Sequence, residues 1–346
     1  MKKVFKTVIA GYGYMGQIRR KVIENNPSLE LIGICETDAA AREKIQGCEA
    51  FDSFEKALDC GPDIVFVCTP NCYSPQICIE SMRRGKHVFC EKPPGRNLED
   101  VKSIIAAEGQ GTKLMFGFNH RFHPAVIKAK VIVDSMRLGE VIGMRGVYGK
   151  SGGMNFSQSW RNDKNTSGGG ILLDQGIHML DIFRHFCGDF QSVKCFMSNR
   201  FWKFDIEDNA YVILQNQKQQ NALLHSSATL WRHAFQLNII LENGYLLIEG
   251  LLSKTGSYGR EKLIIGKRQF EDEALALGNP SEEVIYFDKD LSWDIEVEEF
   301  IKCIHNNTKV IMSSSADALG VMEIIDKAYK DAEAKRRPDG EKYCCF

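Results

Sequence analysis

Two ionisable residues stand four positions apart in an otherwise apolar stretch of the chain. Residues 168–181 read G-G-G-I-L-L-D-Q-G-I-H-M-L-D, with Asp174 and His178 at positions i and i+4. On an α-helix these side chains would share one face, with their Cβ atoms about 5–6 Å apart. An imidazole beside a carboxylate is suited to proton transfer, because the unperturbed pKa of histidine, about 6.5, lies near neutral pH. Taken alone, the pair is more typical of a structural helix contact or a buried core histidine.

A lysine occupies a position from which its side chain could be aimed at a substrate. Lys92 follows a short strand-like run at 87–90 and precedes Pro93 and Pro94, so it lies on a turn that the prolines make rigid. An ammonium group held next to a substrate hydroxyl would stabilise the alkoxide that develops as the hydroxyl loses its proton. A solvated surface lysine is the alternative interpretation.

Three glycines near the N-terminus have the spacing of a nucleotide-binding turn. Gly11, Gly13 and Gly16 form a G-x-G-x-x-G pattern directly after an apolar run at 5–10. Such glycines allow a tight turn, a close approach of the backbone to a pyrophosphate, and packing of the next helix on the sheet. The phosphates would then meet free N–H groups at the positive end of that helix.

The residues after the glycines complete a strand–helix–strand unit. A helix is expected over 17–25 and a second strand over 29–35, which ends in Glu36. A carboxylate about 20 residues beyond the last glycine binds the ribose hydroxyls of NAD and repels the 2′-phosphate of NADP. The predicted cofactor is therefore NAD, with NADP less favoured, although Arg42 could tolerate the extra phosphate.

Strand and helix patterns continue to alternate through the first third of the chain. Near-continuous apolar strands at 63–68, 87–90 and 113–118 are separated by helical patterns at 75–84 and 98–107, which indicates a parallel sheet covered on both faces. Ligands of such sheets bind at the carboxyl ends of the strands. The segments at those ends should therefore converge on one crevice: Gly11–Gly16, Glu36, Thr69–Asn71, Glu91–Lys92 and Asn119–Arg121.

Beyond Phe122 the pattern changes to longer strands with short loops, which favour antiparallel pairing. A helix at 124–136 precedes strand-like runs at 141–150, 192–199, 209–216, 222–229, 236–241 and 245–250, and helices return at 293–305 and 316–334. Asn243-Gly244 predicts a type I′ hairpin, since both residues tolerate positive φ angles. Residues 256–279 are polar and irregular, and we expect loops there.

These patterns predict an α/β protein of two domains. Residues 1–122 would form a Rossmann domain with a doubly wound parallel sheet. Residues 123–346 would form an α+β domain with one large, mostly antiparallel sheet, and the C-terminal helix at 316–334 could pack back on the first domain. If helices cover one face of the second sheet, the other face needs cover, so we expect a homodimer or homotetramer through it.

Composition excludes several classes of protein. The 346 residues are 44% hydrophobic and 26% charged, with a formal net charge of -1 and no basic run, so nucleic acid is not an expected partner. Residues 1–3 lead into a strand too short for a signal-peptide core or a membrane span. Twelve cysteines are scattered through predicted strands and helices, as reduced core residues are. We therefore expect a cytoplasmic protein without a membrane partner.

No metal site is expected. His120-x-x-His123 has a spacing that could hold a metal ion, but no third ligand is suggested nearby. A polar loop is the favoured interpretation of this pair.

Five segments together resemble a known family. G-Y-G-Y-M-G at 11–16, C-T-P-N at 68–71, C-E-K-P at 90–93, G-F-N-H-R-F at 117–122 and the stretch at 168–181 follow the order and spacing of the Gfo/Idh/MocA oxidoreductases. The E-K-P and D-x-x-x-H elements together are specific to the family, whereas the glycine pattern alone is not. The resemblance covers most of the chain. It implies a Rossmann domain, a following sheet domain, and a nicotinamide cofactor bound across the crevice.

The resemblance also implies roles for individual residues. Lys92 matches the lysine of E-K-P, and Asp174 and His178 match the family's acid and histidine, the histidine being the usual proton donor or acceptor. The expected cofactor-binding residues are Gly11, Gly13, Tyr14, Met15, Gly16, Glu36, Thr69, Pro70, Asn71, Glu91, Lys92 and Asn119. The expected substrate-binding residues are Lys92, Arg121, Trp160, Arg161, Asp174 and His178. For Arg121, Trp160 and Arg161, ion pairs and a packing tryptophan are an equally good interpretation.

One position departs from the family pattern. Many relatives have a histidine three residues after the asparagine of T-P-N, where this chain has Ser74. Any contact that such a histidine makes in relatives is therefore not expected here.

The expected function is that of an NAD-dependent dehydrogenase acting on a sugar, an inositol or a nucleotide sugar. His178 would take the hydroxyl proton, Asp174 would orient the imidazole, and Lys92 would stabilise the oxygen. The alternatives are a catalytically silent sensor of the same fold, which would have no need of a proton-transfer group, and a reductase of non-sugar carbonyls.

Overall fold

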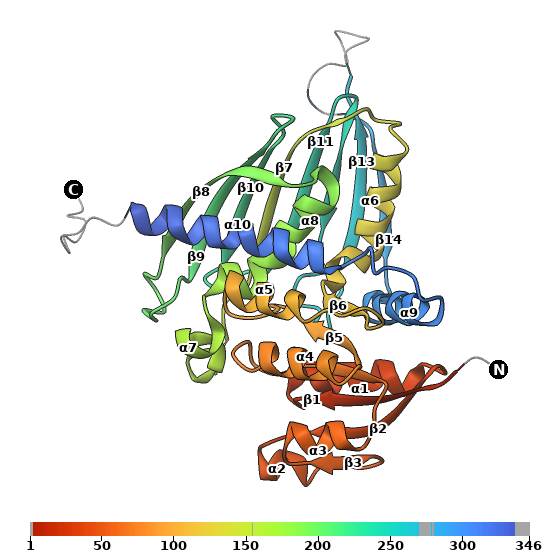
Figure 1. Ribbon diagram of the computed structural model, residues 1–346. Coiled ribbons are helices and arrows are strands. Elements are labelled where there is room, and N and C mark those ends of the chain that lie inside the picture. Colours follow the sequence, from red (N-terminus) through yellow and green to blue (C-terminus); the bar gives the residue numbers. More distant parts are fainter. Residues whose placement is uncertain (1–2, 154, 270–277, 279, 336–346) are drawn as a thin grey trace.

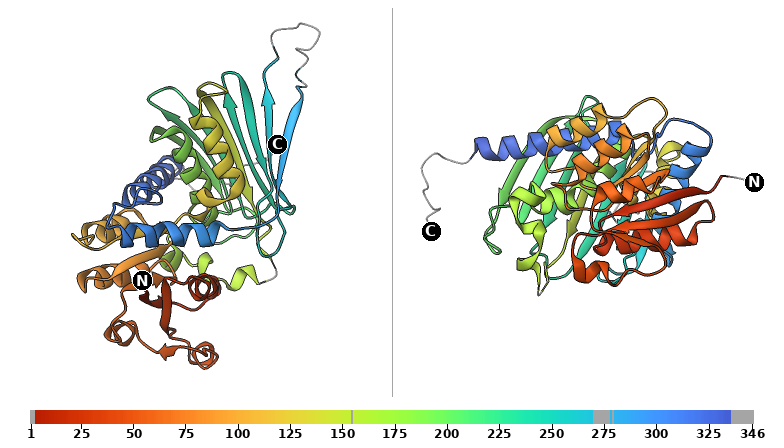
Figure 2. Two further views of the ribbon diagram at one scale, coloured as in Figure 1. Left: turned by 90° about the vertical axis from the view of Figure 1, so that its right-hand side faces the viewer. Right: turned by 60° about the horizontal axis from the view of Figure 1, so that its bottom comes forward.

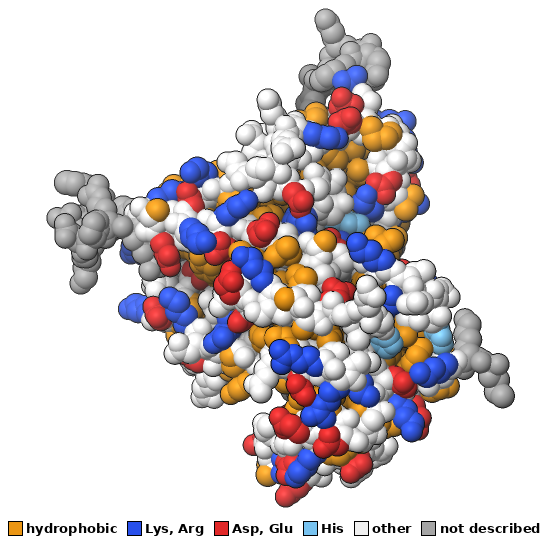
Figure 3. Space-filling view, in the orientation of Figure 1, with side chains coloured by type: hydrophobic (Ala, Val, Ile, Leu, Met, Phe, Trp, Pro, Cys, Tyr) orange, Lys and Arg blue, Asp and Glu red, His pale blue; other side chains and the backbone are white. Residues whose placement is uncertain are grey.

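The protein contains two sheets stacked end to end (Figure 1), in a computed structural model that describes residues 3–153, 155–269, 278 and 280–335. The smaller sheet, formed by the N-terminal third of the chain, lies at the bottom of Figure 1, and the larger one rises above it. Acidic and basic side chains alternate over the face shown in Figure 3, which agrees with a net charge near zero.

The first sheet is parallel and has the strand order β3-β2-β1-β4-β5-β6. Its strands are β1 (Phe5–Ala10), β2 (Leu29–Cys35), β3 (Glu49–Phe51), β4 (Ile64–Val67), β5 (His87–Glu91) and β6 (Leu114–Gly117). The connecting helices are α1 (Tyr14–Asn25), α2 (Ala39–Arg42), α3 (Phe54–Asp59), α4 (Ser74–Arg83) and α5 (Leu98–Ala106), and a 3₁₀ turn, η1 (Asn119–Phe122), follows β6. Strands β4 and β6 are buried along their whole length, because helices cover both faces. The predicted Rossmann sheet is confirmed.

The second sheet has eight strands in the order β14-β13-β12-β11-β7-β10-β9-β8. They are β7 (Val141–Gly149), β8 (Phe190–Ser198), β9 (Asn209–Asn216), β10 (Asn221–Ser227), β11 (Ala234–Leu241), β12 (Gly244–Glu249), β13 (Glu261–Lys267) and β14 (Glu282–Phe287). All neighbours pair antiparallel except β7 and β10, which are parallel. The prediction of a large, mostly antiparallel sheet is confirmed.

Helices α6 (Pro124–Asp134), α8 (Ile177–Cys187) and α10 (Ser315–Ala334) lie against one face of this sheet (Figures 1 and 2). Alternate residues of β9 and β11 point into that layer and are buried, whereas the intervening residues face outward. Helix α10 also contacts α5, and α9 (Ser292–His305) packs against α1 and η1, so both C-terminal helices contact the first half of the chain. The boundary between residues 122 and 123 stays a prediction.

Residues 256–260 and 268–269 lack regular structure, as predicted, but the prediction of loops is wrong for 261–267. Strand β13 lies there, with Leu263 and Ile265 buried between β12 and β14. The short run K-L-I-I-G gave too little periodicity to identify a strand, and its pairing depends on distant segments. Residues 270–277 and 279 lie outside the described residues.

The hairpin between β11 and β12 is present, but its turn differs from the predicted type. Leu241 pairs with Gly244, so Glu242 and Asn243 form the loop, and none of these residues has a positive φ. A Cβ on Gly244 would lie 2.2 Å from the carbonyl oxygen of Gly266. The glycine is therefore needed for the close approach of β13 rather than for the turn.

Within the described residues, no helix combines the length and apolar character that crossing a membrane requires.

Candidate active site

A cleft of about 710 Å³ opens at the carboxyl ends of β1, β2 and β4. Parallel sheets bind ligands at this edge, where the strand order reverses between β1 and β4. The cleft is lined by seven of the residues predicted to bind a cofactor: Gly11, Gly13, Tyr14, Met15, Glu36, Thr69 and Pro70. Trp160 and Arg161, from the turn η3 (Trp160–Asn162), line it from the second half of the chain.

The glycine turn has the shape that a bound pyrophosphate requires. Gly11 has a φ of 90°, and a Cβ there would lie 2.8 Å from the carbonyl oxygen of Cys68. A Cβ on Gly16 would lie 2.2 Å from the carbonyl oxygen of Gly11, so α1 can pack close to the turn only with a glycine. Gly13 has open space beside it, and no side chain caps the first turn of α1. The N-terminal N–H groups of α1 are thus available to an anion.

Glu36 is fixed at the mouth of this cleft. Its carboxylate accepts hydrogen bonds from the backbone N–H of Tyr12 (2.9 Å) and of Asp38 (3.0 Å). Arg42 donates to the carbonyl oxygens of Glu36 and Thr37, at 2.8 and 3.1 Å. The guanidinium is therefore engaged with the backbone, while the carboxylate is the group presented to the cleft.

Lys92 and Asp174 come together, as the sequence predicts. The Lys92 Nζ donates to the carbonyl oxygen of Asp174 at 2.6 Å and lies 3.7 Å from its carboxylate. Two further cations hold the same carboxylate: Lys150 at 3.1 Å and Arg161 at 3.2 Å. Lys150, at the end of β7, was missed by sequence analysis, because no motif marks it and its partner is 24 residues away.

His178 lies near this cluster without a bond to Asp174. Its ring is buried and stacks on His120, with centroids 3.7 Å apart, and its Nδ1 has no hydrogen-bond partner. The expectation that Asp174 orients the imidazole is therefore wrong. Residues Leu172–Gly176 form a π-helical turn, which changes the α-helical i, i+4 relation that the prediction assumed.

His120 belongs to a buried aromatic and polar group around His178. Its Nε2 is 3.2 Å from the hydroxyl of Tyr148, and its Nδ1 is 3.1 Å from the side-chain oxygen of Asn119. His123, the second histidine of the H-x-x-H pattern, bonds Glu261 at 2.8 Å instead. In the part of the chain that the structure describes, no group of side chains has the makings of a metal site.

The electrostatics of the site are set by burial and by excess positive charge. Burial and the nearby Lys92 keep the pKa of His178 well below its ordinary value, so the imidazole is neutral at neutral pH. Burial also lowers the pKa of Lys92, against the opposing effect of Asp174. Burial alone would raise the pKa of Asp174, but Lys150, Lys92 and Arg161 hold it below its ordinary value.

Other predicted residues have structural partners. Arg121 is buried and bonds Asp181 through two nitrogens, each at 2.7 Å, so it forms an internal ion pair and offers no free anion-binding group. Asn71 donates to the carbonyl oxygen of Ser167 at 2.7 Å. Glu91 accepts from Arg19 at 2.6 Å. Asn119, besides its contact with His120, donates to Ser292 at 3.2 Å.

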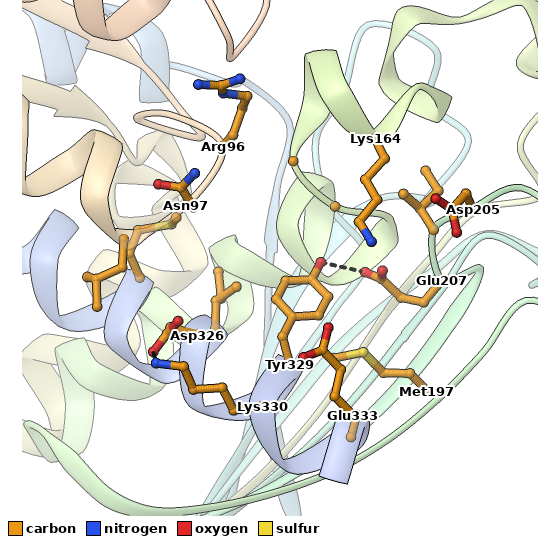
Figure 4. Close-up of a pocket in the computed structure, with 17 residues that line it drawn as sticks. Arg96, Asn97, Lys164, Met197, Asp205, Glu207, Asp326, Tyr329, Lys330 and Glu333 are labelled. Atoms are coloured by element: carbon orange, nitrogen blue, oxygen red, sulfur yellow. Dashed lines mark hydrogen bonds and ion pairs between the residues drawn. The ribbon is translucent and has the colours of Figure 1, made fainter. Parts of the chain in front are cut away.

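A buried glutamate anchors the segment that carries Asp174. Glu207 accepts hydrogen bonds from the backbone N–H of Gly170 (3.0 Å) and Leu172 (2.9 Å) and from the hydroxyl of Tyr329 (3.0 Å). A cavity of about 270 Å³ adjoins this contact, lined by α10 and by residues 96–98 and 205–207, and Figure 4 shows Tyr329 directed at Glu207. Sequence analysis missed both residues, because each lies more than 30 positions from the segment it holds.

Comparisons with known proteins agree with this architecture. The family described as oxidoreductases with an NAD-binding Rossmann fold (GFO_IDH_MocA) matches residues 5–118, and the GFO/IDH/MocA C-terminal domain matches residues 126–247.

Among characterised relatives, levoglucosan dehydrogenase of Pseudarthrobacter phenanthrenivorans is 32% identical over 52% of this chain and 45% of its own length. Inositol 2-dehydrogenase of Rhizobium meliloti is 30% identical over 52% of this chain and 54% of its own. The chain thus spans about half the length of these curated relatives. A solved structure of levoglucosan dehydrogenase with NADH and levoglucosan superimposes with a TM-score of 0.84, at 20% identity, over 96% of this chain and 98% of that one, which shows a shared fold.

Proposed function

Because the chain belongs to the Gfo/Idh/MocA oxidoreductases, we propose that it is an NAD-dependent oxidoreductase of a sugar, an inositol or a nucleotide sugar. The observation that carries this proposal is the meeting of Lys92, Asp174 and a neutral, buried His178 close to a cleft with a glycine-rich turn. The names of the relatives, levoglucosan and inositol 2-dehydrogenase, support a polyol substrate.

The residues of the cleft fit NAD. The turn at Gly11 and Gly13 would hold the pyrophosphate, and Glu36 would accept hydrogen bonds from the adenosine ribose and repel a 2′-phosphate. When bound, the nicotinamide supplies the hydride acceptor or donor. The proposal keeps NAD as the preferred cofactor, since Arg42 is bonded to backbone oxygens.

In the oxidising direction, the imidazole of His178 takes the proton of the substrate hydroxyl while the carbon gives up its hydride. A neutral histidine is needed for this step, and the lowered pKa of His178 supplies it. The ammonium of Lys92 stabilises the negative charge that develops on the substrate oxygen. Asp174 acts through Lys92, because its carbonyl and carboxylate oxygens fix the position of Nζ.

The test is a screen of sugars, inositols and nucleotide sugars with NAD, monitored by nicotinamide absorbance. We expect NADH to form with at least one of them and His178→Ala to slow this reaction by roughly 10²- to 10⁴-fold. A protein that binds NADH and a sugar but turns over no compound, with sugar binding unchanged in His178→Ala, would instead be a sensor.

We also propose a homodimer or homotetramer formed through the outer face of the larger sheet. Adjacent strands expose Phe196, Tyr211 and Ile213 there, at 64%, 48% and 51% of their surface, and Ile142 and Ile240 extend the patch. Burial of such a patch against a second copy would remove apolar surface from water. Light scattering that gives a monomer at micromolar concentration would contradict this.

A cytoplasmic location is the remaining proposal, supported by ten described cysteines with free thiols.

A further inference from the structure

We propose that the substrate carries an anionic group, a carboxylate or a phosphate, near the carbon that reacts, and that Lys150 and Arg161 bind it. This inference rests on the proposed function and specifies the substrate class of the same site. It starts from the charges that surround Asp174.

Three cations surround a single carboxylate. Lys92, Lys150 and Arg161 all lie within 4 Å of the Asp174 carboxylate. One negative charge therefore faces three positive ones, which leaves a surplus of two. Such a surplus is unfavourable in a partly buried site unless an anion completes it.

The neighbouring carboxylates do not offset this surplus. Glu91, next to Lys92 in the chain, is paired with Arg19. Glu207 is turned to the backbone N–H groups of Gly170 and Leu172. Asp208 likewise accepts from the backbone N–H groups of residues 201 and 202. Each of these acids already has its own partners, and none is bonded to Lys150 or Arg161 in the described structure.

The two cations remain open to a ligand. The side chains of Lys150 and Arg161 are 21% and 36% exposed, whereas the fully paired Arg121 is 3% exposed. An ammonium and a guanidinium are also the groups that bind carboxylates and phosphates most strongly. A neutral polyol would leave the surplus of two positive charges uncompensated.

Lys150 is the residue that distinguishes an anion of the substrate from the phosphates of the cofactor. Arg161 lines the cofactor cleft and could contact the cofactor as well, but Lys150 is not among the residues that line it. Lys150 extends from the end of β7 and reaches the same carboxylate as Lys92. An anion bound by Lys150 would therefore lie in the same side-chain cluster as an oxygen bound by Lys92.

The experiment titrates the NADH-loaded protein with inorganic phosphate, with acetate and with neutral glycerol, followed by calorimetry. NADH is bound first, so that its own phosphate site is filled. We expect phosphate or acetate to bind and glycerol not to bind. The anion with the higher affinity indicates whether the substrate carries a phosphate or a carboxylate. In Lys150→Gln the affinity for the anion should fall roughly 10- to 100-fold, as for loss of a charged hydrogen-bond partner. Lys150→Arg should keep it.

Lys102→Gln is the matched control. Lys102 also pairs with a carboxylate, that of Glu99 at 2.8 Å, but it lies exposed on α5. Its loss should leave the anion affinity unchanged.

A second arm compares D-glucose, D-glucuronate and D-glucose 6-phosphate, which differ only in the group at one carbon. Tighter binding of a charged sugar by the wild type, reduced in Lys150→Gln, supports the proposal. Binding of neither anion, or anion binding indifferent to Lys150→Gln, overturns it. The proposal is also overturned if Lys150→Gln lowers the turnover of charged and neutral sugars by the same factor and shifts the alkaline limb of the pH–rate profile. Lys150 would then only tune the pKa of Lys92. Failure to bind NADH would instead refute the proposed function.

Discussion

Two ionic clusters begin at consecutive residues of the chain, and they differ in burial and in charge balance. Glu91 and Lys92 are consecutive, yet Glu91 belongs to a sealed cluster with Arg19 and Glu296, and Lys92 belongs to the open cluster around Asp174. Arg19 and Glu296 are fully buried, whereas the cations of the open cluster are 16–36% exposed. The sealed cluster joins parts of the fold, and the open one is left for a ligand.

The sealed cluster reaches neutrality within the protein. Arg19 on α1 donates to Glu91 at 2.6 Å and to Glu296 on α9 at 2.8 Å. One cation faces two carboxyls, and burial, with Glu91 nearby, raises the pKa of Glu296 to about 8. Glu296 therefore keeps a proton at neutral pH, and the cluster carries no net charge. Among the described residues, Asp174 is the acid that faces the three cations of the open cluster, and in our proposal an anionic ligand neutralises the remaining positive charge.

The first prediction removes the proton acceptor beside the open cluster. His178→Ala should lower turnover by roughly 10²- to 10⁴-fold, the usual effect of losing a positioned acid–base group. NADH affinity should be nearly unchanged, because His178 does not line the cofactor cleft. Steady-state rates and NADH fluorescence titration measure the two effects. His305→Ala, at the end of α9, is the control. Near wild-type turnover in His178→Ala would remove the proton-transfer role.

The second prediction breaks the sealed cluster. Arg19→Met should destabilise the protein by about 3–5 kcal/mol, because Glu91 would remain buried without its counter-ion. Urea unfolding measures this. The matched control is Arg84→Met: Arg84 also pairs with two carboxylates, Glu80 and Asp59, but at the surface. Its loss should have little effect, and equal effects of the two substitutions would contradict the distinction between sealed and exposed clusters.

Sequence analysis identified the open cluster better than the sealed one, for a physical reason. Lys92 and Asp174 stand in local motifs, and strand-end convergence in a parallel sheet brings such motifs together. Arg19 looks like an ordinary polar residue of α1, because its partners are 72 and 277 positions away. Lys150 was missed for the same reason. The fold itself was predictable, since buried strands and amphipathic helices are encoded locally, except for the short strands β3, β13 and β14, which are defined by their pairing with neighbouring strands.

The third prediction concerns the proton of Glu296. Its folded pKa of about 8 exceeds the ordinary 4.5. Between these values the folded protein holds a proton that the unfolded chain releases, so this group's stabilising contribution is complete below pH 4.5 and is lost as pH rises to 8. The slope is at most about 1.4 kcal/mol per pH unit. Glu296→Gln should remove it. The difference between variant and wild-type unfolding free energies at pH 5, 6.5 and 8 tests this, and a constant difference would show that Glu296 does not titrate there.

The fourth prediction compares how substitutions in the two clusters and at Glu36, in the cofactor cleft, affect the choice between NADH and NADPH. Glu36→Ala should weaken NADH binding by about 1.5–3 kcal/mol, the range for a hydrogen bond to a charged group, and should narrow the preference for NADH over NADPH. Fluorescence titration of both cofactors measures it. Arg19→Gln and Asp174→Asn should leave that preference unchanged. Tighter binding of NADPH by the wild type would refute the assigned role of Glu36.

The smallest expected effect distinguishes an acid of the open cluster, Asp174, from an acid of the sealed cluster, Glu296. Burial already lowers the pKa of Lys92, and Asp174 opposes this. Asp174→Asn removes the opposing charge, so the ammonium should lose its proton at lower pH, and the alkaline limb of the kcat/KM profile should move down by about one pH unit. Glu296→Gln should leave this limb in place, because Glu296 is sealed behind Arg19 and is already protonated at neutral pH. The acid limb should lie below pH 6.5 in both variants, since burial keeps His178 neutral. If the alkaline limb moved equally in Asp174→Asn and Glu296→Gln, the two clusters would form one electrostatic unit. The net positive charge assigned to the open cluster would then have to be calculated over the residues of both clusters.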